Sequence, residues 1–148
     1  MRKVPETALV SLLLAIALVV GALGTSEWRR TVSFGAPLPG SEKLQTSTFF
    51  RSGFDLAAGP LWFALILLGL ATLATTIGWR RIGAVTAISG PLPLARYLVS
   101  FHLPETNRLD GATHYPLWPA TVAFALAVIA AALGIILLAR ALEMPRSE

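Results

Sequence analysis

The segment 60–81, PLWFALILLGLATLATTIGWRR, restricts the fold more than any other part of the sequence. Its only ionisable side chains are those of Arg80 and Arg81 at its end, and Trp62 and Trp79 stand near its two ends. In an α-helix these tryptophans would lie about 25 Å apart, close to the ~30 Å hydrocarbon core of a bilayer. Indole rings at both ends and cations beyond one end would fix the depth of a membrane-spanning helix.

The composition also favours a membrane protein. The 148 residues, one domain by length, are 55 % hydrophobic and only 14 % charged, whereas about a quarter of the residues of a soluble domain are charged. The net charge of +4 comes from cations beside apolar segments, and no lysine/arginine run exceeds two residues, so we predict no nucleic-acid surface. The absence of cysteine excludes disulfides, thiolate metal sites, a thiol nucleophile and a lipidated cysteine.

The first apolar segment, residues 8–24, permits two interpretations. The cationic start and the small residues at Ala22-Leu23-Gly24 are compatible with a cleaved signal peptide. The apolar run is longer than a typical signal core, and Trp28-Arg29-Arg30 beyond it is typical of an interfacial stop. We therefore predict an uncleaved first helix over about residues 5–24.

The third apolar segment, 82–101, is the weakest of the four. Its Gly90-Pro91-Leu92-Pro93 run would interrupt a regular helix, and only fourteen residues lie between Arg81 and Arg96. We predict a span kinked at Gly90–Pro93; a re-entrant half-helix or an interfacial helix is the alternative. The last segment, opened by Trp118, is a clear span, and the four predicted helices cover about residues 5–24, 60–79, 82–101 and 117–140.

These segments predict an all-α integral membrane protein with a single domain over 1–148: a four-helix bundle, or three spans plus a re-entrant or interfacial helix. Both termini, including the tail 141–148, would be cytoplasmic, with outer loops at 25–59 and 102–116, because six of the cations on this assignment lie inside and five outside. The expected location is the bacterial inner membrane, crossed several times.

The outer loop 25–59 has two possible structures. Residues 31–34 and 45–50 are rich in β-branched and aromatic residues, enough for a short hairpin. Alternatively the loop lies on the lipid headgroups, with its phenylalanines at the interface: Phe34, Phe49, Phe50 and Phe54.

Small and hydroxyl-bearing residues recur on single faces of the predicted helices. Such faces let helix backbones approach closely in lipid, where no hydrophobic drive brings helices together; alanine-rich helices also produce the same spacings by chance. The helix-packing candidates are Ser11, Ala15, Ala17 and Gly21 in the first helix, Gly69, Thr72 and Thr76 in the second, and Ala123, Ala127, Ala130 and Gly134 in the last.

Side chains suited to anchoring the protein in lipid or to a partner form a second group. Arg96 is the one cation within an apolar segment; it can bind a lipid phosphate or a partner's carboxylate, or serve only as a topology anchor. The apolar runs 8–24, 60–78 and 117–139 contain no ionisable group, which argues against ion transport or a proton relay. The anchor candidates are Arg96, Trp28, Trp62, Trp79, Arg80, Arg81 and Trp118.

The loop 102–116 contains a group of side chains that could in principle gather a metal ion. His102, Glu105, Asp110 and His114 lie within thirteen residues, but their spacing matches no compact metal-binding signature. Solvated side chains are the simpler interpretation, so we predict neither a metal nor a cofactor. No phosphate-binding glycine loop, nucleophile elbow or carboxylate pair on a helix face occurs, and we do not predict an enzyme.

The segments 52–85 and 115–140 resemble the small four-helix membrane proteins of actinobacteria, among them the tryptophan-associated (tryptophan-operon-region) family. The shared features are an arginine-bearing turn between the second and third helices and a Trp-Pro opening of the fourth. The resemblance implies a fold and no catalytic residues. The order of a helix, a Trp-bearing loop and three helices is also similar to claudin-like proteins, although the cysteine pair expected in that loop is absent.

We therefore expect a non-catalytic accessory or assembly subunit of a larger membrane complex of the respiratory, secretion or lipid-export type. Its partners would be membrane lipids and other integral membrane subunits, in an oligomeric state that the sequence leaves open. The alternatives are a small lipid or solute carrier that uses the Gly90–Pro93 break and Arg96, and a membrane-anchored sensor that uses the loop 25–59.

Overall fold

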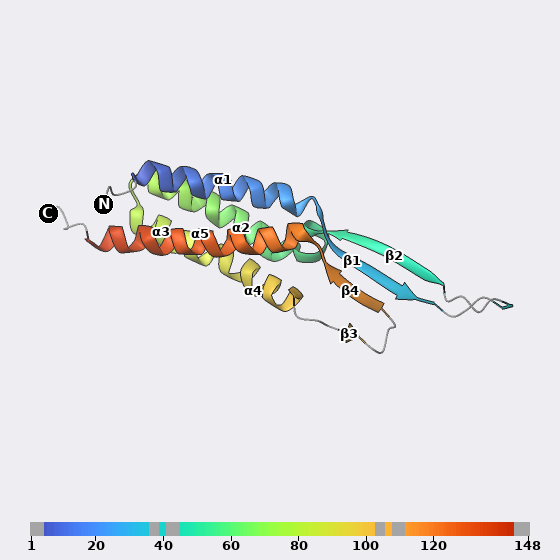
Figure 1. The fold of residues 1–148 in the computed structure, drawn as a ribbon. Helices are drawn as coiled ribbons and strands as arrows, with labels where there is room; N and C mark the ends of the chain where they lie inside the picture. Colours follow the sequence, from blue (N-terminus) through green and yellow to red (C-terminus); the bar gives the residue numbers. More distant parts are fainter. Residues whose placement is uncertain (1–4, 36–38, 41–44, 103–105, 108–111, 144–148) are drawn as a thin grey trace.

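The protein, as a computed structural model, contains a helical bundle with a small β-sheet at one end (Figure 1). The structure describes residues 5–35, 39–40, 45–102, 106–107 and 112–143. Within these ranges the helices are α1 (Glu6–Gly24), α2 (Gly53–Thr76), α3 (Arg80–Ser89), α4 (Pro91–His102) and α5 (Trp118–Glu143). The strands are β1 (Glu27–Phe34), β2 (Thr46–Ser52), β3 (Thr106–Asn107) and β4 (Ala112–Pro116).

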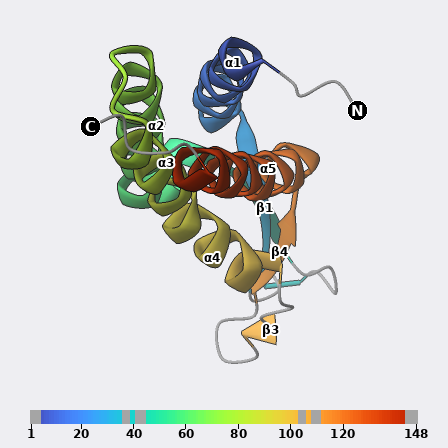
Figure 2. The same cartoon turned by 90° about the vertical axis from the view of Figure 1, so that its left-hand side faces the viewer.

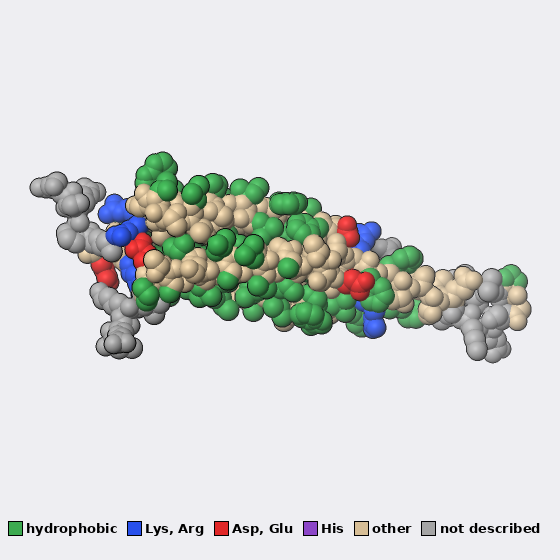
Figure 3. Space-filling view, turned by 90° about the horizontal axis from the view of Figure 1, so that it is seen from above, with side chains coloured by type: hydrophobic (Ala, Val, Ile, Leu, Met, Phe, Trp, Pro, Cys, Tyr) green, Lys and Arg blue, Asp and Glu red, His purple; other side chains and the backbone are tan. Residues whose placement is uncertain are grey.

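Four helices are long and apolar enough to cross a membrane: α1, α2, the consecutive α3 and α4 taken together, and α5. Both described ends of the chain lie at one end of the bundle, which we call the termini end, and the sheet lies at the other, the sheet end (Figure 1). Charged side chains gather at the two ends, and the flank between them shows hydrophobic side chains (Figure 3). The predicted four-helix organisation is thus confirmed by the length and composition of the helices.

Helix α2 begins earlier than the sequence predicts, at Gly53 rather than at residue 60. The Ser52 hydroxyl accepts a hydrogen bond from the Asp55 amide at 3.2 Å, and the Asp55 carboxylate accepts one from the Ser52 amide at 3.2 Å. This reciprocal capping satisfies amide groups that would otherwise lack partners at the helix start. The apolar content of the segment 60–81 could not reveal the seven residues, 53–59, by which the capped helix extends toward the N-terminus.

The predicted break of the third span lies at the boundary between α3 and α4, and it is mild. Gly90 keeps right-handed helical dihedral angles (φ −63°, ψ −54°), and its amide donates to the Thr86 carbonyl at 3.0 Å. A Cβ atom at Gly90 would lie 2.8 Å from Cβ of Leu67 in α2. Glycine therefore lets the interrupted helix approach α2 closely, and the chain continues in one direction instead of turning back.

Close backbone approach also organises the rest of the bundle, in which α5 packs against α1, α3 and α4 (Figure 2). Gly134 of α5 lies against Ile88 of α3, where a Cβ atom would come within 2.7 Å of the isoleucine side chain. On α5 the predicted packing residues are all buried, and the same helix also buries Leu133 and Leu137. The buried candidates are Ala123, Ala127, Ala130 and Gly134.

The β-sheet corrects the all-α prediction. Its order is β2-β1-β4-β3, and every neighbouring pair is antiparallel. The hairpin predicted in 25–59 is confirmed as β1 and β2, whereas the loop 102–116 was wrongly expected to be only a polar connection, because it supplies β3 and β4. The sheet continues the long axis of the bundle (Figure 1), so the alternative in which 25–59 lies flat on headgroups does not describe this fold.

Replacing Gly134 by alanine should destabilise the bundle, because the added methyl group meets Ile88 across the α3–α5 contact. Overpacking of this kind costs about 1–3 kcal/mol. Gly69→Ala is the matched control, since nothing lies within 4 Å of the position of its Cβ atom. Thermal unfolding in detergent should show a lower midpoint for Gly134→Ala and no loss for Gly69→Ala; equal midpoints would contradict this packing.

Candidate functional site

The junction between the sheet and the bundle is built around Trp28. The register of β1 against β2 shifts between Glu27 and Arg29, so Trp28 occupies a bulge. Its side chain is fully buried, and its indole N–H donates to the Leu23 carbonyl at 2.7 Å, at the end of α1. A Cβ atom at Gly53, the first residue of α2, would collide with the indole. Glycine at this position is therefore required for the close contact.

A second polar contact near the sheet end compensates for Pro60 inside α2. Proline has no amide hydrogen, so residue 60 cannot donate to the Leu56 carbonyl one turn earlier. The Tyr97 hydroxyl of α4 donates to that carbonyl at 2.9 Å. The bond connects α2 to α4 at a point where a backbone acceptor in an apolar environment would otherwise lack a partner.

One face of the sheet is hollowed close to this junction. The register places Arg29 opposite Arg51, and Thr31 opposite both Phe49 and His114. The Thr31 hydroxyl and Nδ1 of His114 lie 3.0 Å apart, within hydrogen-bonding distance. The pocket, which we call the sheet pocket, has a volume of about 360 Å³. Its lining residues are Arg29, Thr31, Phe49, Phe50, Arg51 and His114.

Strand β2 forms an edge of the sheet. Six of its seven residues are exposed, and the side chains of Phe49 and Phe50 remain 58 % and 51 % accessible. Strand β1 pairs with β2 on one side and with β4 on the other. Within the described part of the chain no strand pairs with the outer side of β2, which therefore presents unpaired backbone groups beside two aromatic rings.

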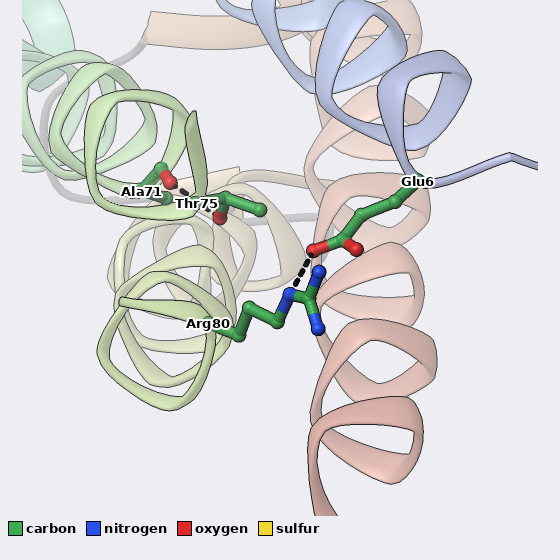
Figure 4. A network of polar contacts seen from close by, with 4 residues as sticks. All are labelled: Glu6, Ala71, Thr75 and Arg80. Carbon is green, nitrogen blue, oxygen red and sulfur yellow. Dashed lines mark hydrogen bonds and ion pairs between the residues drawn. The ribbon is translucent and has the colours of Figure 1, made fainter. Parts of the chain in front are cut away.

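The termini end contains a different set of polar groups (Figure 4). Nε of Arg80 lies 3.0 Å from the Glu6 carboxylate, so an ion pair joins the start of α3 to the start of α1. Beside it is a cavity of about 420 Å³ between α1 and α2. Its lining residues are Glu6, Thr7, Val10, Ser11, Thr75, Thr76, Gly78 and Arg80.

The predicted packing faces of α1 and α2 have different outcomes from that of α5. Ala17 is buried and Gly21 is half-buried, with Leu65 of α2 near its Cβ position. The remaining candidates do not pack within the bundle core: Ser11, Ala15, Gly69 and Thr76 are exposed and Thr72 is half-buried. The predicted stripe on α2 is therefore wrong as an internal contact. The inward face of that helix consists of Leu61, Ala64, Leu68, Ala71, Ala74 and Thr75.

Among the predicted anchors, Trp28 needs correction, because its buried indole cannot contact lipid headgroups. The sequence suggested an interfacial ring because two arginines follow it, but the β-bulge turns the ring into the bundle. The other anchor candidates lie on the surface, and their contact with lipid stays a prediction. They are Trp62, Trp79, Arg80, Arg81, Arg96 and Trp118.

The weak metal candidates are not brought together in the described residues. Glu105 and Asp110 lie outside these residues, as does the side chain of His102, while His114 contacts Thr31. Within the described ranges no group of three histidine or carboxylate side chains could hold a metal ion. The arrangement that the structure does show, cations and aromatic rings on an exposed sheet, is suited to binding.

Sequence reasoning missed two of the contacts that build this region. Strand β4 could have been suspected from the β-forming run Thr113-His114-Tyr115. The Tyr97 contact could have been sought because Pro60 removes the donor for Leu56. No family model matches the chain, and no curated protein is significantly similar to it in sequence.

Tyr97→Phe should lower stability, because it leaves the Leu56 carbonyl without its hydroxyl donor. A buried acceptor that loses its partner costs about 1–3 kcal/mol. Tyr115→Phe removes the same atom from an exposed ring on the sheet and serves as the matched control. Reversible unfolding in mixed micelles should separate the two variants; equal stability of Tyr97→Phe and the wild type would contradict the bridging role.

Proposed function

We propose that the protein is a non-catalytic accessory subunit of a larger membrane complex in the bacterial plasma membrane, with its sheet on the extracytoplasmic side. In this arrangement the four helices hold the protein in the bilayer, and β2 offers a docking edge to another subunit. The family likeness to small four-helix actinobacterial proteins is part of this proposal. It is compatible with respiratory, secretion or lipid-export complexes.

The observation that supports this function best is the exposed aromatic edge of β2. Natural sheets protect their edges with charges, prolines, bulges or covering elements, because a free edge pairs with other chains. The bulge lies in β1 and not in the edge strand β2. The middle of β2, Thr48-Phe49-Phe50, carries no charge or proline. A partner strand added to this edge would satisfy its backbone groups and cover the two rings.

The hydrogen bonds of the ladder indicate which groups of β2 face a partner. The Gly35 amide donates to the Gln45 carbonyl at 2.7 Å, so these two residues form a hydrogen-bonded pair. Bonded and non-bonded pairs alternate in an antiparallel ladder. The amides of Thr46, Thr48 and Phe50 therefore point away from β1, toward the free side of the edge.

The carrier alternative receives less support from the geometry. A broken transporter helix exposes unwound backbone to its substrate, whereas Gly90 keeps helical dihedral angles and its amide bonds to Thr86. The exposed edge strand has no role in a carrier of that kind. We therefore prefer docking to a partner subunit over transport.

Thr48→Pro tests the docking edge directly. Proline would remove an outward-facing amide without removing a bond between β1 and β2, and its ring would obstruct an added strand. Thr48→Val keeps the amide and a β-branched side chain and is the matched control. Purification in mild detergent with mass-spectrometric identification should recover a membrane partner with the wild type and with Thr48→Val, and at least about tenfold less with Thr48→Pro, as expected for the loss of 1–2 hydrogen bonds. A lone monomer from wild-type membranes would contradict the function itself.

The proposed orientation can be tested by cysteine labelling, since the chain contains no native cysteine. Thr46→Cys places a thiol on β2 and Arg81→Cys places one at the opposite end of the bundle, both at exposed positions. A membrane-impermeant maleimide should label Thr46→Cys in spheroplasts and label Arg81→Cys only after permeabilisation. Labelling of both thiols before permeabilisation, or the reverse pattern, would overturn the assigned topology.

A further inference from the structure

The sheet pocket combines positive charge with apolar walls. Arg29 and Arg51 are directly opposite each other in the β1–β2 ladder, which places their Cβ atoms about 5 Å apart. Phe49 contributes a ring on the same face of the sheet as the two arginines. Thr31 and His114 contribute a hydroxyl group and a ring nitrogen on the neighbouring strand pair. Among the residues that the structure describes, none that lines the pocket is acidic.

Two cations opposite each other concentrate positive charge at one point of the sheet. An anion bound there can accept hydrogen bonds from both guanidinium groups at once. Guanidinium groups match the geometry of phosphate oxygens and bind them with two hydrogen bonds each. Thr31 and His114 add donors of lower charge beside the pair.

The position of the pocket points to the membrane surface. Arg29 pairs with Pro116, two residues before Trp118, whose side chain is 70 % exposed at the start of α5. Arg51 directly precedes Ser52, the cap of α2. At about 3.3 Å per strand residue the arginines lie ~7 Å beyond Trp118. With Trp118 at the edge of the hydrocarbon core, this is the depth of the lipid headgroups, which are about 5–8 Å thick on each side.

We propose that the sheet pocket binds the phosphate group of an anionic phospholipid, with Arg29 and Arg51 as its two principal ligands. The Phe49 ring would face the less polar glycerol region of the same lipid. Inorganic phosphate presents the same oxygens but has no glycerol region and no membrane to concentrate it. The bound lipid would hold the root of the sheet at a fixed height above the bilayer, independently of any protein partner at the β2 edge.

Native mass spectrometry of the full chain, released from detergent, tests this site. The probes are dioctanoyl phosphatidylglycerol and dioctanoyl phosphatidylcholine at equal concentration, with inorganic phosphate as competitor. Arg29→Gln and Arg51→Gln remove one guanidinium group each. Arg30→Gln is the matched control, because Arg30 lies next to Arg29 but is placed over the ring of Tyr115, 5.0 Å from its centre, and does not line the pocket.

The wild type and Arg30→Gln should bind phosphatidylglycerol at least about tenfold better than phosphatidylcholine, because the two arginines attract its net negative charge, whereas the choline cation of phosphatidylcholine neutralises the phosphate and is repelled by them. Arg29→Gln and Arg51→Gln should each lose this preference. Without lipid, Arg51→Gln should unfold at the same midpoint as Arg30→Gln, because each substitution removes one exposed cation from the sheet; this result shows that lost binding is not lost folding.

Three results would overturn the proposal. Equal binding of the two lipids by the wild type would show that the two arginines do not select a lipid of net negative charge. An equal loss in Arg30→Gln would show that overall charge, not the pocket, attracts the lipid. Displacement of phosphatidylglycerol by millimolar inorganic phosphate would overturn the lipid assignment and identify free phosphate as the ligand of the same two arginines.

Discussion

The contact between Trp28 and Gly53 holds the β-sheet against the helical bundle. Both partners are needed for this contact, because the indole is fully buried and any side chain at residue 53 would occupy its place. The indole N–H also satisfies the carbonyl of Leu23 where α1 ends. One side chain therefore joins the end of the first helix, the first strand and the start of the second helix. The position of the sheet pocket and of the β2 edge relative to the bilayer follows from this junction.

Within the bundle, glycine and alanine lie at the helix contacts beside buried leucines such as Leu13, Leu68 and Leu94. Lipid solvates an outward leucine as well as a neighbouring helix does, so stability depends on close contact and on satisfied backbone groups. Gly134 against Ile88 and Gly90 against Leu67 provide the close contact. Tyr97 provides a donor for the carbonyl that Pro60 leaves without one. The close contacts and the tyrosine hydrogen bond each involve α3, α4 or the junction between these two helices.

The sequence allowed the helices to be predicted much better than their orientation about their own axes. Uncharged runs of bilayer length identify spans because charges are costly in lipid. In α2, however, both the inward residue Leu61 and the outward residue Leu70 are leucines, so hydrophobic periodicity could not show which face packs. The small-residue rule succeeded for Ala123 and Ala130 of α5, where alanines occupy the contact face, and failed for Gly69 of α2, which faces outward.

The sheet was harder to predict because its pairings join distant parts of the sequence. Local β-forming residues indicated the hairpin of β1 and β2. Strand β4 could not be predicted as readily, because it is only five residues long. Such a strand is stable only beside a partner, and its partner β1 lies on the other side of three helices. The burial of Trp28 depends on a bulge that local sequence does not specify. The basic pocket arises only when these strands are in register.

The pairing of β1 with β4 has a consequence for biogenesis. Thr31 and His114 are separated by 83 positions in the chain, and α2, α3 and α4 all lie between them. The central strand therefore receives its second neighbour only after the intervening helices have been synthesised and have returned the chain to the same side. A chain stalled during insertion, or inserted with a helix missing, would display an incomplete sheet. The finished sheet is therefore a signature of a fully synthesised helical domain, because β1 has both of its neighbours only in a molecule that contains the intervening helices.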